Sequence, residues 1–109
     1  MEVRTPREFF EKTMPTRFNP NKAKDVEATV QMTVTGPNGG YWTITIKNQK
    51  MTVKEETHPS PTVAIRISDS DFIDLVNGKL NGIEALMTGK LEFKGSFGAG
   101  MKLLETGLI

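Results

Sequence analysis

Four short runs in which apolar and polar residues alternate place the tightest limit on how this chain can fold. The runs cover 28–35, 41–47, 51–53 and 63–67. In the first run Ala28, Val30, Met32 and Val34 alternate with one glutamine and three threonines. Successive side chains of a strand point to opposite faces of a sheet, so this pattern predicts strands that are buried on one face.

The residues between these runs predict how the strands are connected. The segment 36–40 reads Gly-Pro-Asn-Gly-Gly and Asn48-Gln49 follows the second run, which are two turn signals. We therefore expect a hairpin between the first two strands and a tight turn before the third. The stretch 55–61 contains two prolines and His58 and is expected to be a loop. Residues 19–24 are expected to form a polar connection.

A helix is predicted near the N-terminus. Thr5 is a suitable cap, Pro6 suits the first helical position and Glu8 closes a capping box. The apolar residues of this helix would be Phe9, Phe10 and Met14. We expect the helix to end near Pro15, because a proline ring disfavours helical conformation at the preceding residue.

The segment from Ser68 to Leu104 predicts three more helices and a fifth strand. Ser68 and Asp71 suit a capped helix that Gly78 ends, and a second short helix is expected from Asn81 or Gly82 to Gly89. Leu91 and Phe93 alternate with charged residues as a half-buried strand would. A Gly-rich helix is expected after Gly95, with apolar residues at helical spacing: Phe97, Met101, Leu104 and Leu108. The apolar faces of these elements outline a pocket.

The order helix, four strands, two helices, strand, helix predicts an α+β fold. We expect a five-stranded, mostly antiparallel sheet with helices covering one face, in a single domain over 1–109. The net charge is +1 and the charges are spread along the chain, so the sequence indicates no nucleic-acid partner and no polybasic membrane anchor. It has no signal-peptide pattern and no segment long enough to cross a bilayer. We therefore expect a cytoplasmic protein without stable membrane insertion.

The sequence offers few groups for catalysis or metal binding. There is one histidine, His58, and no cysteine. Asp69, Asp71 and Asp74 form the densest group of carboxylates, but the glycine and glutamate that a calcium-binding loop needs are missing at the required spacing. Acidic residues are common at a helix N-terminus because they interact favourably with its dipole. We expect no catalytic residue, no metal site, no cofactor and no enzymatic activity.

Several segments in series resemble the sterol carrier protein type 2 domain family. They are Ile67–Phe72, Gly78–Lys79, Met87–Leu91, Lys94–Gly95 and Met101–Leu103, together with the Thr35–Gly36 turn and the strand that contains Trp42. The resemblance implies a five-stranded sheet covered by helices, with an apolar tunnel that binds fatty acyl chains, acyl-CoA, sterols or phospholipids. It implies no covalent chemistry. Since the chain carries no peroxisomal address, it is similar to prokaryotic stand-alone members.

The leading hypothesis is therefore a non-enzymatic protein that binds or transfers an elongated hydrophobic ligand, such as a fatty acid, acyl-CoA or another lipid. The ligand would contact eight apolar side chains: Phe72, Val76, Leu86, Met87, Phe93, Phe97, Met101 and Leu104. The alternative hypothesis is a protein–protein interaction module that uses the same apolar surface. A homodimer is its simplest form.

Overall fold

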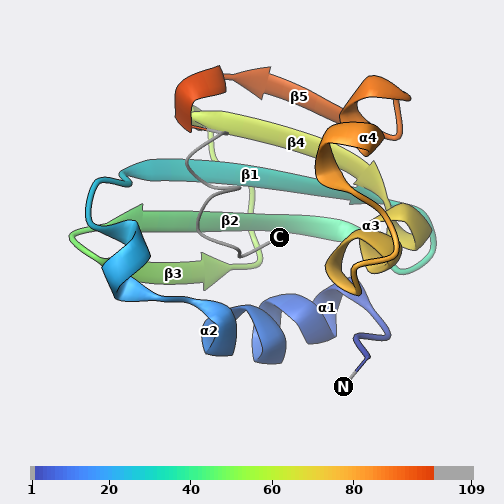
Figure 1. Ribbon diagram of the computed structural model, residues 1–109, viewed down its shortest axis with the longest axis horizontal. Coiled ribbons are helices and arrows are strands. Elements are labelled where there is room, and N and C mark those ends of the chain that lie inside the picture. Colours follow the sequence, from blue (N-terminus) through green and yellow to red (C-terminus); the bar gives the residue numbers. More distant parts are fainter. Residues whose placement is uncertain (1, 100–109) are drawn as a thin grey trace.

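The computed structural model describes residues 2–99 of the chain. Figure 1 shows a twisted sheet with helices packed on it. The elements are α1 (Pro6–Glu8), the π-helical segment η1 (Phe9–Thr13), α2 (Met14–Arg17), the 3-10 segment η2 (Pro20–Ala23), β1 (Ala28–Thr35), β2 (Gly40–Lys47), β3 (Lys50–Lys54), β4 (Val63–Ser68), α3 (Asp69–Val76), α4 (Gly82–Met87) and β5 (Leu91–Gly95).

The strand order is β3-β2-β1-β4-β5. Strands β1 and β4 pair in parallel, and the other three neighbouring pairs are antiparallel. The predicted α+β fold with a mostly antiparallel five-stranded sheet is therefore confirmed. The predicted β1–β2 hairpin is also present, and Asn48 and Gln49 form the tight β2–β3 turn with positive φ angles of 54° and 61°. The Gly-rich helix expected after Gly95 lies largely outside the described residues.

Local sequence signals account for most helix ends. The Thr5 side chain accepts a hydrogen bond from the Glu8 N–H, and Ser68 accepts one from the Asp71 N–H, as expected of caps. The Glu8 carboxylate accepts from the Arg4 N–H rather than from that of the cap residue, so the box closes one residue earlier than predicted.

The N-terminal helix runs past the predicted end near Pro15, and the expectation that Pro15 excludes the preceding residue from the helix is wrong, because Met14 is helical. The helix continues to Arg17, because its middle section is a π-helical segment in which the Met14 N–H bonds to the Phe9 carbonyl. The wider hydrogen-bonded turn removes the strict α-helical geometry in which a proline ring would clash with the carbonyl four residues earlier. Pro15 consequently sits in the first turn of α2.

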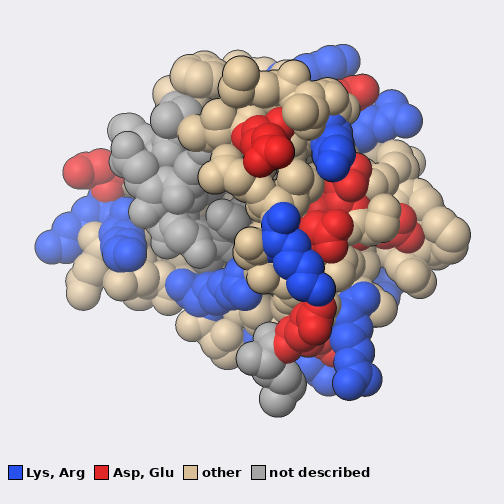
Figure 2. Space-filling model, turned by 45° about the vertical axis from the view of Figure 1, so that its right-hand side comes forward, with Lys and Arg blue, Asp and Glu red and all other residues tan. Residues whose placement is uncertain are grey.

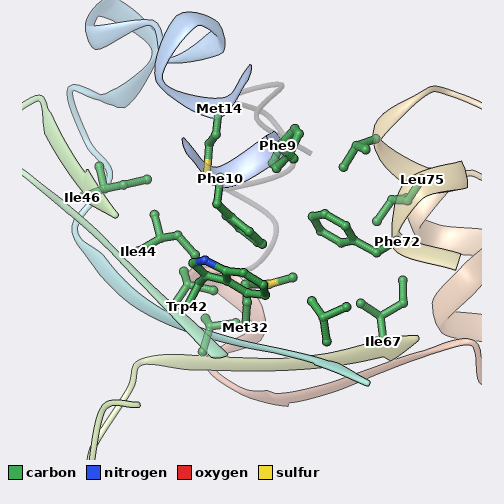
Figure 3. Packing of buried hydrophobic residues seen from close by; sticks show 14 of the residues in the cluster. Phe9, Phe10, Met14, Met32, Trp42, Ile44, Ile46, Ile67, Phe72 and Leu75 are labelled. Carbon is green, nitrogen blue, oxygen red and sulfur yellow. The ribbon is translucent and has the colours of Figure 1, made fainter. Parts of the chain in front are cut away.

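The main core lies between the sheet and the helices α1–α2 and α3. Figure 3 shows Phe9, Phe10 and Met14 approaching the sheet from one side and Phe72 entering from α3. The Phe10 ring stacks on Trp42, with 4.6 Å between centroids, and on Phe72, with 5.3 Å. None of these five side chains is more than 2% exposed. The aromatic cluster fastens the N-terminal helix to the sheet and to α3.

The connection between β3 and β4 covers the other face of the sheet. Gln31 and Thr43 lie opposite each other on that face, and both bond to the Glu56 carbonyl. The Gln31 side chain also accepts a hydrogen bond from the backbone N–H of His58, over 2.6 Å. Gln31 is buried as a result, although the alternation placed it on the polar face. This connection carries the chain across β2 and β1 so that β4 pairs in parallel with β1.

Candidate apolar binding site

The helix-facing side of the sheet is apolar from one edge to the other. The strand register places these side chains on one face: Ala28, Val30, Met32, Val34, Trp42, Ile44, Ile46, Met51, Val53, Val63, Ile65, Ile67, Leu91 and Phe93. No charged side chain of residues 28–95 shares this face within the strands. Such a surface can be covered by core residues or by an apolar ligand.

Burial of this face changes across the sheet. Its side chains on β1 and β2 are buried, whereas Ile65, Leu91 and Phe93 at the β4–β5 edge are half-buried. Phe97 follows β5 and meets the Phe93 ring edge-on, with 6.2 Å between centroids. Phe97 nevertheless is 64% exposed. Met51 and Val53 on β3 are half-buried at the other edge, but the β4–β5 edge is the one beside the exposed Phe97.

Helix α4 contributes further apolar surface beside β5. The Asn81 side chain caps this helix by accepting from the Ile83 and Glu84 N–H groups. Ala85 is the buried residue of α4, while Ile83, Leu86 and Met87 are 54%, 38% and 81% exposed. The predicted apolar spacing is present, but it faces outward. In Figure 1, α3 and α4 lie at the same end of the sheet, where β4 ends and β5 begins.

The structure divides the predicted ligand-binding residues into two groups. Phe72 and Val76 of α3 are buried in the main core. The second group lies at the β4–β5 edge or on α4 and is half-buried or exposed: Leu86, Met87, Phe93 and Phe97. Met101 and Leu104 lie outside the described residues. Ile65 and Leu91 were not among the predicted site residues, although their place in the alternating runs puts them on the same face as Phe93.

One charged pair lies beside the Trp42 part of the apolar face. Arg7 forms a bidentate ion pair with Glu55 and lies 5.9 Å from the centre of the Trp42 ring. Hydrogen bonding by the guanidinium lowers the pKa of the exposed Glu55 carboxyl below its usual range. On the molecular face in Figure 2, basic and acidic side chains are interspersed. The face in this view therefore offers no one-signed surface for a polyanion.

Residues 2–99 provide no group of three or more His, Cys, Asp or Glu residues that could hold a metal ion. His58 is half-buried, and its Nδ1 accepts a hydrogen bond from the Ser60 N–H. In the same part of the chain, no helix is long and apolar enough to span a membrane.

Comparison with known protein families shows which family this chain belongs to. The model of the SCP-2 sterol transfer family matches residues 10–106. The chain belongs to this family. Membership of the SCP-2 family indicates that the chain binds or transfers lipid. The family does not favour the alternative of a pure interaction module.

Individual relatives of this SCP-2 domain differ in length. Non-specific lipid-transfer protein-like 1 of Caenorhabditis elegans is 35% identical over 82 residues, which are 73% of this chain and 70% of that protein. Hydroxysteroid dehydrogenase-like protein 2 of Xenopus laevis is 31% identical over 93 residues, 84% of this chain but 22% of that protein. The chain therefore spans less than a quarter of this second relative.

A solved structure supports the fold. The solution structure of the sterol carrier protein domain 2 of Helicoverpa armigera aligns with a TM-score of 0.75 and 32% sequence identity. The alignment covers 99% of this chain and 94% of that one.

Proposed function

We propose that this SCP-2 domain is a non-enzymatic carrier that holds the acyl chain of a lipid against the β4–β5 half of its sheet. The observation that carries the proposal is the continuous apolar surface formed by Ile65, Leu91 and Phe93, which are half-buried, and by the exposed Phe97. Covering such a surface with a ligand stabilises the complex by about 25 cal/mol for each Å² of apolar area removed from water.

The residues have different parts in this proposal. Leu86, Met87, Phe93 and Phe97 contact the ligand, with Met87 adapting its shape to different chains. Phe72 and Val76 form the wall behind the ligand, and Met101 and Leu104 are proposed to complete the enclosure as an apolar tunnel. Ile65 and Leu91 form its floor.

The charge distribution indicates which part of a lipid would bind. The strand residues that face the helices include no charged side chain to neutralise a buried head group, and an unpaired charge is costly to bury. The acyl part is therefore held inside and the polar head stays in water. Fatty acids, acyl-CoA and other single-chain lipids fit this description.

The test is saturable binding of a fluorescently labelled stearic acid and its displacement by unlabelled oleate. Phe97→Ala should weaken binding, because it removes an exposed ring from the proposed site. Tyr41→Ala is the matched control, since Tyr41 is 53% exposed on the opposite face of the sheet. No saturable binding across several lipid classes, or equal losses in the two variants, would contradict the proposal. Sedimentation with and without oleate would show whether the same surface instead joins two copies of the chain.

A further inference from the structure

The exposed apolar residues of this domain are unevenly distributed. Among residues 2–99, five large hydrophobic side chains are exposed, and four of them lie between 83 and 97. They are Ile83, Leu86 and Met87 on α4 and Phe97 after β5. Since α4 packs against β5, the exposed face of the helix adjoins the half-buried β4–β5 surface. Exposed apolar side chains therefore gather beside this edge of the apolar layer.

The opposite side of the apolar layer is sealed. Phe9, Phe10 and Met14 are almost fully buried there. Hydrogen bonds also hold this segment: the Asn77 side chain both accepts from the Val3 N–H and donates to the Val3 carbonyl, each over 2.8 Å. Lifting the N-terminal helix would expose several large side chains and break these bonds. A lipid cannot readily enter from that side.

Helix α4 is attached to the domain in a different way. Among the described residues, 81–90 form hydrogen bonds only with one another. Hydrogen bonding to the sheet begins with the next residue, Leu91. Moving the segment therefore breaks no hydrogen bond to the other residues of 2–99. Among the side chains of α4 itself, only the small Ala85 is buried. Local openings of this kind are expected where few buried contacts hold an element.

Helix α4 lies between two glycines with open surroundings. Gly78 and Gly89 adopt positive φ angles of 77° and 80°, and a β-carbon at either position would meet no atom within 4 Å. The chain around them is therefore unobstructed. Leu80 and Leu91, by contrast, pack against the main core and anchor the two flanks. A movable helix between fixed ends is the arrangement of a hinged lid.

We propose that residues 81–90 form the gate through which the lipid enters and leaves, with Ile83, Leu86 and Met87 contacting the acyl chain during passage. This inference rests on the proposed function and adds the route of entry. The gate moves as one unit because its caps and hydrogen bonds are internal. The proposed movement turns the outward apolar face of α4 toward β5, so that Ile83, Leu86 and Met87 cover an acyl chain that lies between the helix and the strand.

The kinetic test uses Met87→Glu, a change at a side chain that is 81% exposed and therefore compatible with folding. A carboxylate in the gate must lose water as an acyl chain passes. Association and dissociation of fluorescently labelled stearic acid should both slow, by about fivefold, in stopped-flow experiments. Arg7→Gln is the control, because it releases an ion pair of the sealed side and should change neither rate.

A second measurement follows the gate directly. The chain has no cysteine, so Met87→Cys can carry a polarity-sensitive fluorophore at one position. Its emission should shift to the blue saturably with oleate, whereas the same label on Thr52→Cys, on the exposed outer side of β3, should not respond.

The outcomes separate the gate from the carrier function. If binding is saturable but Met87→Glu only speeds dissociation, or changes neither rate, the gate is refuted and the proposed function stands. Faster exchange in Arg7→Gln would place the entry beneath the N-terminal helix and also refute it. If no lipid binds the wild-type protein, the proposed function fails and the gate fails with it.

Discussion

Replacing Phe72 and Phe97 by alanine should give very different losses of stability, although the two changes remove the same atoms. Phe72 is not exposed at all; its ring stacks on Phe10 at 5.3 Å and meets Phe9 edge-on at 5.4 Å. Truncating a phenylalanine in a packed core costs about 3 to 5 kcal/mol. That is a large part of the roughly 5 to 15 kcal/mol by which a domain is stable.

Truncating Phe97 should cost much less stability. It is 64% exposed and has one ring contact, edge-on with Phe93. Phe97→Ala should therefore lower the free energy of unfolding by about 0.5 kcal/mol. The comparison isolates burial, because side-chain type and substitution are held constant.

The assay is urea unfolding followed by the fluorescence of Trp42, the only tryptophan, whose ring stacks on Phe10. For Phe72→Ala the midpoint should fall by about 1 M or more, since the slope for small domains is about 1 to 3 kcal/mol per M of urea. Phe72→Leu retains more of the volume and should lie between Phe72→Ala and wild type if the alanine variant is too unstable to measure. Similar midpoints for Phe72→Ala and Phe97→Ala would refute the assignment of Phe72 to a packed core.

Three other perturbations test the polar face, a turn and an ion pair. Gln31→Ala should cost about 1 to 3 kcal/mol in urea unfolding, because it leaves buried backbone groups without a hydrogen-bond partner. Gly36→Ala should destabilise the protein by about 1 to 3 kcal/mol in calorimetry, because φ is +101° and a β-carbon would lie 2.5 Å from the Asp69 Oδ1 atom. Hydrogen bonding to Arg7 lowers the Glu55 pKa in the folded state, so its contribution is present above the ordinary carboxyl pKa and is lost as pH falls through the lowered value. Thermal unfolding of Glu55→Gln should consequently depend less on pH in that acidic window than wild type; an unchanged dependence would show that the pair does not stabilise the fold.

The sequence by itself determined the features that depend on near neighbours. Alternation placed Val30, Ile44 and Ile67 on a buried sheet face, and the structure buries all three. The caps at Thr5 and Ser68 follow from hydrogen bonds over three residues. Strand pleating, turns and caps are local geometry, so short patterns suffice to predict them.

Tertiary structure decided what covers each face. Spacing placed Ile83, Leu86 and Met87 together on α4, but a helical period does not show whether another element packs on that face, and here the three are exposed. Strand alternation likewise placed Gln31 on the polar face of the sheet, but it could not show that the 55–62 connection covers this residue. Phe72 and Phe97 were equivalent candidates in the sequence. Burial arises from contacts between distant segments, and only the folded chain brings Phe9 and Phe10 onto the Phe72 ring and leaves the Phe97 ring largely exposed.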